Sequence, residues 1–248
     1  MKNKLLHAAS AAFWIGVWWL MAVLVGREVL IPTPWQVLVR LWALLMEADF
    51  WKTLVFSLLR ITAGFLAGVV LGTAAGALTA AVPVTEPLLE PLLILIKAAP
   101  VASFIILALV WMKADAIPVF ISFLIVFPIL QSNVRTGILA VPTGLRQMLQ
   151  VFRVKPLRRV GALYVPAVLP YFSSACCTAF GMAWKAGVAA EVISLPMQSI
   201  GRELYFSRLY LLTPDVFAWT LTVVLLSLGM EKLLKAGLRR ISKGGEKA

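Results

Sequence analysis

The sequence predicts an all-α membrane protein with about six transmembrane helices. Hydrophobic residues make up 61% of the 248 residues, and charged residues make up only 14%. The mean hydropathy is +0.93. A soluble globular domain carries about 25% charged residues, so this balance excludes a water-soluble globule and places most of the chain in a bilayer.

Six apolar stretches have the length of a membrane span. A bilayer core about 30 Å thick requires roughly 20 apolar residues per helix. The candidates are residues 8–26, 59–82, 91–112, 116–133, 167–186 and 214–233. A very short turn separates the third and fourth candidates, and Pro100, Pro118 and Pro128 interrupt them. No linker divides the chain, so we expect a single transmembrane domain over residues 1–248.

The first candidate span has two interpretations. Lys2 and Lys4 precede an apolar run that continues to about Val25, as in a signal peptide. The run is long and has no clear small-x-small cleavage motif, which favours a retained anchor.

The segment 27–58 is not a simple loop, because apolar residues recur along it at helical spacing. They are Trp35, Val37, Leu38, Leu41, Trp42 and Leu45. An amphipathic helix at the outer interface, anchored by tryptophans and starting at Pro34, fits this pattern. An extension of a neighbouring span fits it equally well.

The basic residues predict the orientation of the spans. More than half of the 23 lysines and arginines fall at the amino terminus, between the fourth and fifth spans, and in the tail from Lys235. Since lysine and arginine favour the cytoplasmic side, we expect both termini to be cytoplasmic. The net charge of +12 therefore indicates contact with anionic lipid and not with nucleic acid.

Several kinds of chemistry lack the residues that they need. Cys176 and Cys177 are adjacent in an apolar run and are expected to be packing residues, and the lone His7 offers no ligand set for a metal. We find no catalytic constellation and expect no cofactor. The chain also has no Gly-x-x-x-x-Gly-Lys-Ser/Thr phosphate loop, so it is not predicted to hydrolyse ATP itself.

A basic loop at about 134–166 separates the fourth and fifth spans. Its basic residues are Arg135, Arg146, Arg153, Lys155, Arg158 and Arg159. Within it, residues 144–152 predict a short helix that carries Leu145, Met148, Leu149 and Phe152 along one side. Such a helix can dock into a groove on a partner protein, and the alternative is a loop that lies on the membrane surface.

The end of this loop, residues 163–170, resembles the close of the coupling loop in permease subunits of bacterial ABC importers. That loop reads Glu-Ala-Ala, three residues, Gly, nine residues, Ile, one residue, Leu-Pro. The corresponding positions here are Gln147, Met148, Leu149, Arg153, Leu163, Val165 and Pro166. The hydrophobic-x-hydrophobic-Pro ending is kept, whereas Gln147 replaces the acidic residue and Arg153 replaces the glycine.

Further segments resemble the nitrate/sulfonate/taurine branch of these permeases. They are Ile31-Pro32-Thr33-Pro34-Trp35, Ser57-Leu58-Leu59-Arg60-Ile61 with Gly64, Ala183-Trp184-Lys185 with Val188-Ala189-Ala190-Glu191, and Ser199-Ile200-Gly201. The resemblance covers most of the chain, and the order of the segments is more specific than any one of them.

The resemblance implies a type I importer in the bacterial inner membrane. This chain would form the pathway together with a second copy as a homodimer. A cytoplasmic ATPase dimer and an external substrate-binding protein would complete the importer. The alternative is a secondary transporter that works without an ATPase. No acidic residue lies deep in a predicted span to relay protons, which disfavours that alternative.

Charged and small residues inside the spans are the remaining candidates. Lys185 and Glu191, near the outer end of the fifth span, are candidate pathway residues, and Lys185 would attract an anionic substrate. An ion pair between them or an interface anchor is the structural alternative. Lys97 is expected to extend its side chain to the inner membrane face. The stripe Gly64, Gly68, Gly72 and Gly76 predicts close helix packing, within the subunit or across a dimer axis.

Overall fold

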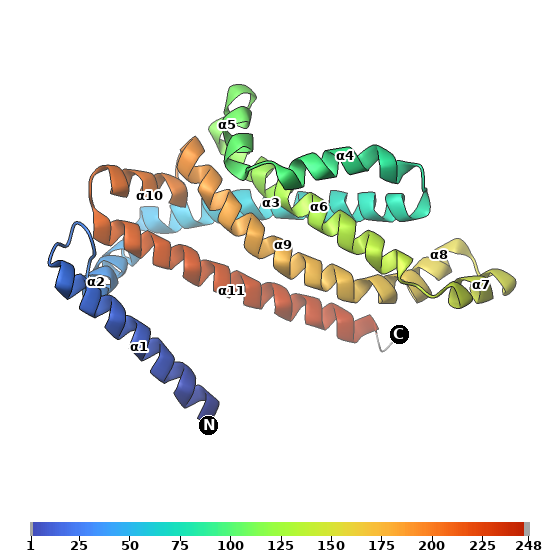
Figure 1. Ribbon diagram of the computed structural model, residues 1–248, viewed down its shortest axis with the longest axis horizontal. Coiled ribbons are helices and arrows are strands. Elements are labelled where there is room, and N and C mark those ends of the chain that lie inside the picture. Colours follow the sequence, from blue (N-terminus) through green and yellow to red (C-terminus); the bar gives the residue numbers. More distant parts are fainter. Residues whose placement is uncertain (1, 246–248) are drawn as a thin grey trace. The chain divides into compact units, whose positions relative to one another are not determined.

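The computed structural model describes residues 2–245, and these form helices with no strand. The helices are α1 (Lys2–Val25), α2 (Pro34–Leu45), α3 (Ala48–Ala81), α4 (Thr85–Ala98), α5 (Val101–Trp111), the 3-10 turn η1 (Ala114–Ala116), α6 (Ile117–Leu139), α7 (Thr143–Val151), α8 (Pro156–Arg159), the π-helical turn η2 (Val160–Tyr164), α9 (Val165–Ser194), α10 (Ile200–Leu209) and α11 (Thr213–Gly245). Figure 1 shows these elements in chain order. The side chains of Lys2, Lys4 and His7 lie outside the described part.

Two compact units divide the chain. The first contains the residues up to Ser57 and Leu195–Leu226, and the second contains Leu58–Ser194 and the residues from Ser227 onward. Helices α3 and α11 each contribute residues to both units.

Four described segments are long and apolar enough to cross a membrane. They are Ala48–Ala81, Ala114–Leu139, Pro156–Ser194 and Thr213–Arg240. They correspond to the second, fourth, fifth and sixth predicted spans. The apolar part of α1, Ala9–Val25, is shorter, and α4 with α5 gives a fifth candidate if this pair is taken as one span.

The third predicted span, 91–112, is not a continuous helix. Helices α4 and α5 meet at an angle of 105°, a bend that is visible in Figure 1. Ala99 and Pro100 are extended at this break, with ψ angles of 140° and 134°. The residue before a proline avoids the helical conformation, so Pro100 ends α4. Pro118 lies instead in the first turn of α6, where it is tolerated, and Pro128 lies inside the unbroken α6.

In the first unit, α2 is a separate helix that begins where the sequence predicted. The Thr33 hydroxyl caps it by accepting a hydrogen bond from the Gln36 backbone N–H, and Gln36 Oε1 accepts one from the Thr33 backbone N–H, which completes a capping box. Val37 is buried, whereas Trp35 and Trp42 are exposed. Residues 48–58, by contrast, extend α3. The segment therefore contains a helix of its own and also the first turns of the neighbouring long helix.

The core of the first unit is rich in aromatic residues. The Trp18 and Phe217 rings stack with their centroids 5.7 Å apart, and those of Phe50 and Trp219 stack at 4.9 Å. The indole N–H of Trp18 donates to the Pro32 carbonyl oxygen at 3.1 Å. These contacts hold α1, the start of α3 and the start of α11 together.

In the second unit, α6 packs along α9 (Figure 1), and the glycine stripe of α3 faces α6. A methyl group added at Gly64 would lie 2.2 Å from the Val119 carbonyl oxygen, and one at Gly72 would lie 2.7 Å from that of Phe127. These distances leave no room for a side chain. The prediction of close packing is confirmed, and the partner is a helix of the same chain.

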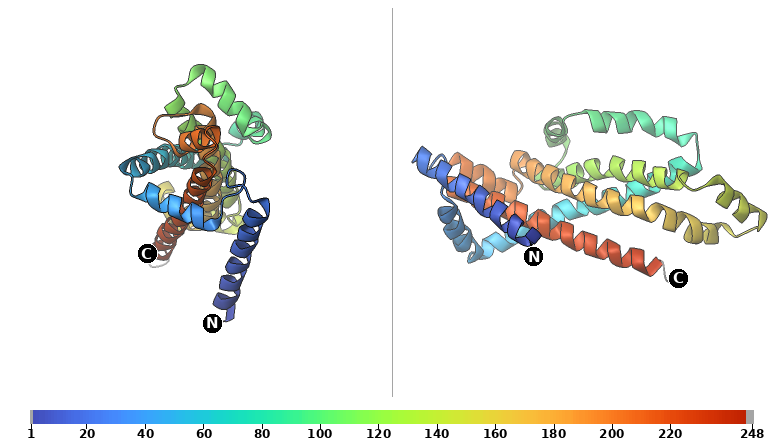
Figure 2. Two further views of the ribbon diagram at one scale, coloured as in Figure 1. Left: turned by 90° about the vertical axis from the view of Figure 1, so that its left-hand side faces the viewer. Right: turned by 60° about the horizontal axis from the view of Figure 1, so that its bottom comes forward.

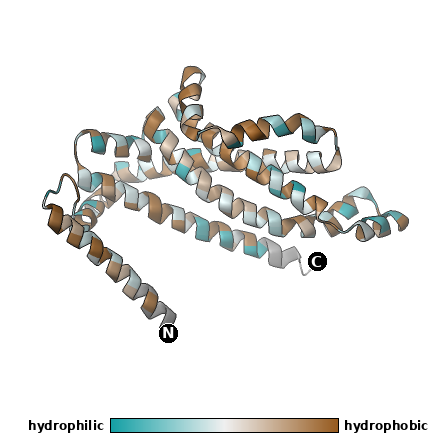
Figure 3. Ribbon diagram, in the orientation of Figure 1, coloured by the Kyte–Doolittle hydropathy of each residue, from teal (hydrophilic) through white to brown (hydrophobic). Residues whose placement is uncertain are grey.

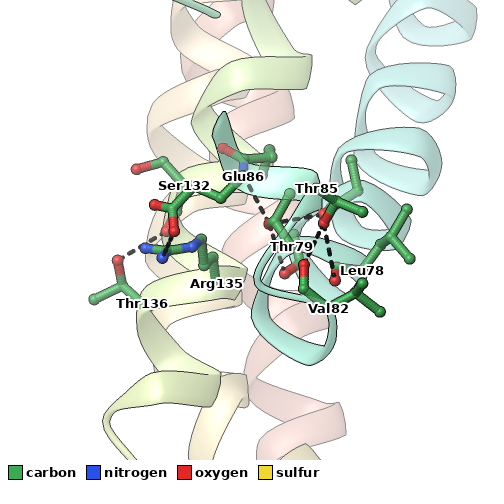
Figure 4. A network of polar contacts seen from close by, with 11 residues as sticks. Leu78, Thr79, Val82, Thr85, Glu86, Ser132, Arg135 and Thr136 are labelled. Atoms are coloured by element: carbon green, nitrogen blue, oxygen red, sulfur yellow. Dashed lines mark hydrogen bonds and ion pairs between the residues drawn. The ribbon is translucent and has the colours of Figure 1, made fainter. Parts of the chain in front are cut away.

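The contact between α3 and α6 becomes polar near the end of α3. Gln131 of α6 donates to the buried Thr79 hydroxyl at 3.0 Å, and Arg135 of α6 forms an ion pair with Glu86 of α4. Figure 4 shows Arg135 beside Glu86, and Thr79 next to Thr85 in the α3–α4 turn. Thr85 donates to the Val82 carbonyl oxygen at 2.7 Å. These bonds fix the α3–α4 turn against α6.

Candidate functional site

The basic loop forms a helical excursion at the ends of α6 and α9. Helices α7 and α8 lie together there, as Figure 1 and the right-hand view of Figure 2 show. The predicted helix 144–152 matches α7, which spans Thr143–Val151 and is followed by Phe152 as its C-cap. Figure 3 shows hydrophobic and hydrophilic residues interspersed along α7, in contrast to the more uniformly hydrophobic α5.

Helix α7 exposes its apolar side chains. None of its residues is buried. Phe152 is 72% exposed and Met148 is 47% exposed, and Leu145 and Val151 are exposed as well. Leu149 is half-buried, and Gln147 is exposed. A helix outside the candidate spans that exposes this much apolar surface is suited to contact with another surface.

A Schellman motif ends α7, and Arg153 provides its left-handed residue. The φ angle of Arg153 is 50°. The Arg153 N–H donates to the Gln150 carbonyl oxygen at 3.0 Å, and the Val154 N–H donates to that of Leu149 at 3.1 Å. Glycine adopts this conformation at the lowest cost. A tight left-handed turn is therefore present at this position, although it is occupied by arginine and not by the glycine of the resembling loop.

Two arginine side chains connect the loop to its surroundings. Arg146 Nη2 donates to the carbonyl oxygens of Ile138 and Leu139 at 2.8 and 3.1 Å, at the end of α6. Arg159 Nε donates to the Val154 carbonyl oxygen at 2.6 Å, just after the Schellman motif. A displacement of α7 is thereby linked to α6 through hydrogen bonds.

The last three residues of the family-like pattern lead into α9. Leu163 is half-buried in the π-helical turn η2, and Val165 and Pro166 form the first turn of α9. A proline is tolerated there because the first N–H groups of a helix have no intrahelical acceptor. The helical path from α8 through η2 into α9 is therefore continuous.

A charged cluster near the other end of α9 contains one of the two predicted pathway residues. Glu191 is fully buried, and its Oε1 lies 3.9 Å from Arg60 Nη1. Arg60 also donates to Asp115 Oδ1 at 2.6 Å. Lys185 is exposed, and no carboxylate of a described side chain lies at ion-pair distance from it. The structure therefore pairs Glu191 with Arg60 and does not bring Lys185 and Glu191 together.

Arg60 was not predicted as a site residue, although an arginine inside an apolar stretch is itself a signal. Its partner could not be found from spacing along the chain, because α3 and α9 are distant in sequence. Gly187 of α9 brings the helices close: a methyl group there would lie 2.7 Å from Ile61 Cγ1. Lys97 is exposed in the last turn of α4.

Three cavities accompany these features. In the first unit, cavities of about 650 and 270 Å³ share Arg40 and Asp215 in their walls. Arg40 binds both carboxylate oxygens of Asp215, and this hydrogen bonding raises the pKa of Arg40. In the second unit, a cavity of about 560 Å³ between α9 and α11 is lined by Cys177 and Lys235 among others. In the described part of the chain, no three His, Cys, Asp or Glu side chains lie where they could hold a metal ion.

Comparison with known proteins identifies close relatives of the whole chain. A probable ABC transporter permease protein of Brucella abortus (strain 2308) is 31% identical over 246 residues, which cover 98% of this chain and 96% of the relative. A probable ABC transporter permease protein of Brucella melitensis biotype 1 is 31% identical over 241 residues, 96% of each chain. No family model matches the sequence.

The match covers nearly the full length of both chains. Identity of this level over nearly the full length of both chains, together with several helices able to cross a membrane, leads to one assignment: this chain is a membrane-spanning transport subunit and belongs to the ABC transporter permeases.

Proposed function

We propose that this chain is the permease subunit of an ATP-driven importer and that α7 is the element that binds the ATPase. The observation that carries the proposal is the exposed apolar side of α7, which is followed by a Schellman motif and connected to α6 by Arg146. In this proposal, Met148 and Phe152 insert into a groove of the ATPase. ATP hydrolysis takes place on that partner protein.

The proposed mechanism is mechanical. Closure of an ATPase dimer would move α7, and the Arg146 bonds would transmit this movement to the end of α6. The continuous path through η2 would transmit it to α9. The pathway then switches between inward-open and outward-open states, and the ligands that bind each state differently supply the energy.

The membrane topology and the partner proteins are part of the same proposal. We propose six membrane passages with both termini in the cytoplasm, counting α1 and the bent α4–α5 pair as one passage each. A second copy of the chain and an external substrate-binding protein complete the importer in a bacterial inner membrane. The segments quoted from the sequence support a cargo of the nitrate, sulfonate, taurine or vitamin-precursor kind.

The test is co-purification of the tagged chain in detergent with the ATPase encoded nearest to it. We expect the native chain to capture the ATPase, and the variant Met148→Asp/Phe152→Asp to lose it, because two charges would replace the apolar contact. Leu211→Asp is the matched control, since Leu211 is 66% exposed and lies outside the basic loop, between α10 and α11. We expect this control to retain the ATPase.

Two outcomes would contradict the proposal. If the double variant inserts normally and still captures the ATPase, α7 is not the contact. If the native chain inserts stably but captures no ATPase, a transporter that works without one becomes the better interpretation.

Lys185 gives a second, narrower proposal for the cargo. It is an exposed cation on α9, six residues before the buried Glu191, and it would attract an anionic substrate such as a sulfonate. Reconstituted transport by Lys185→Gln should then show a raised KM for an anionic cargo with little change in kcat. Normal transport by a correctly inserted variant would eliminate this role.

A further inference from the structure

The smaller cavity of the first unit has an unusual lining. Its volume is about 270 Å³, and it is enclosed by α2, the first turns of α3, α10 and the start of α11. Six polar side chains other than Arg40 line it: Glu47, Asp49, Thr53, Glu203, Ser207 and Asp215. The cavity therefore contains four carboxylates and a single cationic side chain.

Three of these four carboxylates form ion pairs with cationic side chains of the chain. Arg40 binds Asp215 through two hydrogen bonds, and its Nη1 lies 3.9 Å from Glu47 Oε1. Lys52 Nζ lies 3.0 Å from Asp49 Oδ1. Glu203 remains, and among the side chains that the structure describes no cation lies at ion-pair distance from it. The adjacent Arg202 lies over the Phe206 ring, 5.4 Å from its centroid.

Two buried residues in the wall carry hydroxyl groups without a hydrogen-bond partner. Thr53 is 5% exposed and Ser207 is 6% exposed. In the described part of the chain, neither hydroxyl forms a hydrogen bond. Neither oxygen is among the fully enclosed side-chain atoms that lack a partner, so both oxygens are open to the cavity that they line. These hydroxyls, together with Glu203, therefore indicate a ligand with several donors.

We propose that this cavity binds a primary ammonium group, with Glu203 as its counter-ion and the Thr53 and Ser207 hydroxyls as hydrogen-bond acceptors. An ammonium group has three N–H donors and one positive charge, which match one carboxylate and two hydroxyl oxygens. The volume leaves room for a short alkyl chain. A metal ion fits less well, because among the described residues no three suitable ligands converge.

The electrostatics of Glu203 agree with this assignment. Burial is the main cause that raises its pKa, and the nearby carboxylates of Asp215, Glu47 and Asp49 raise it further, while Arg202 lowers it. A cation in the cavity would stabilise the ionised carboxylate and reverse this shift.

Two sources can supply the ammonium group: a free small amine, or a lysine side chain of another protein. The experiment measures the apparent Tm of the purified, full-length protein in detergent against increasing methylammonium chloride. Tetramethylammonium chloride is the matched salt, because it carries the same charge without N–H donors. A second titration uses Nα-acetyl-lysine N-methylamide, whose ammonium group is attached to a short length of backbone.

We expect methylammonium to raise Tm with a saturable dependence that tetramethylammonium does not reproduce. In Glu203→Gln the half-saturating concentration should rise about tenfold, which corresponds to one lost charge-assisted hydrogen bond. Glu90→Gln, at an exposed glutamate of α4, should behave as the native protein. If Glu203→Gln does not fold, Ser207→Ala takes its place, with a smaller expected rise.

The two probes separate the sources. Saturable binding of both indicates that the cavity admits a tethered side chain, and binding of methylammonium alone indicates a free amine. Equal shifts with methylammonium and tetramethylammonium, or an unchanged half-saturating concentration in a folded Glu203→Gln or Ser207→Ala protein, would overturn the proposal.

Discussion

The second unit contains two regions that differ in whether their apolar surface is buried or exposed. Where α3, α6 and α9 meet, glycines and buried apolar side chains fill the space so closely that no methyl group can be added at Gly64 or Gly187. In the basic loop, α7 has no buried residue and leaves Met148 and Phe152 exposed. Both regions show a regular helical pattern of apolar or small residues in the sequence.

The difference lies in what completes each surface. The packed region is completed by the chain itself, so its residues should determine stability. The surface of α7 is incomplete within one copy of the chain, so its residues should determine association and contribute little to stability. Substitutions in the two regions should therefore separate these two properties.

The largest effect is expected for Arg60→Gln in the packed region. Removing the cation leaves the fully buried Glu191 without that ion pair, which should cost about 3 kcal/mol. The measurement is the apparent Tm and the amount of inserted protein. The double variant Arg60→Gln/Glu191→Gln should recover part of the loss, because no buried charge then remains at that pair. An additive loss in the double variant would mean that the two residues act independently.

The next effect is expected for Gly64→Ala. The added methyl group would lie 2.2 Å from the Val119 carbonyl oxygen, so α3 and α6 must separate, at a cost of about 2 kcal/mol. The reduced stability should appear as a lower apparent Tm in detergent.

Gly181→Ala in α9 is the control for this substitution. No atom lies within 4 Å of a methyl group placed there, so we expect a change within about 1 kcal/mol. A similar loss for both variants would contradict the close-packing explanation for Gly64, because alanine favours a helix over glycine and meets no atom at position 181.

In the packed region, some features of the structure could be predicted from the sequence and others could not. The glycine stripe predicted close helix packing, and apolar length predicted four of the spans, because both depend on residues that are neighbours along the chain. The pairing of Arg60 with Glu191 depends on tertiary structure, so it could not be predicted from the spacing of the two residues along the chain. Pro100, Pro118 and Pro128 were all noted as interruptions, but only Pro100 divides its predicted span into two helices. Pro128 lies within an unbroken helix, so proline alone does not distinguish the two cases.

The basic loop was predicted more closely in its helix than in its turn. Four apolar residues at helical spacing located α7 almost to the residue. Arginine replaces the glycine of the resembling loop at position 153, yet the hydrogen bonds of the Schellman motif hold Arg153 at a φ of 50°. Backbone hydrogen bonds can impose a conformation that residue preference alone does not predict.

A smaller effect is therefore expected at Arg153. A left-handed conformation costs an L-residue about 1 kcal/mol, and more for a β-branched one. Arg153→Gly should keep the turn, and Arg153→Val should weaken it by about 1 kcal/mol. Hydrogen exchange at the Val154 amide, which donates to Leu149, reports this directly. Faster exchange in the glycine variant would contradict the Schellman geometry.

The smallest effect on stability is expected for Phe152→Ser, at the end of the exposed helix α7. Phe152 is 72% exposed, so replacing it should change the free energy of unfolding by no more than about 0.5 kcal/mol. The same replacement at Phe65, which is 4% exposed and packs edge-to-face on Phe180 at 5.2 Å, should cost several times more. If Phe152→Ser lowered the apparent Tm of the isolated subunit as much as Phe65→Ser, α7 would belong to the core of the subunit. A small change at Phe152, combined with loss of partner binding, would instead assign its apolar surface to association.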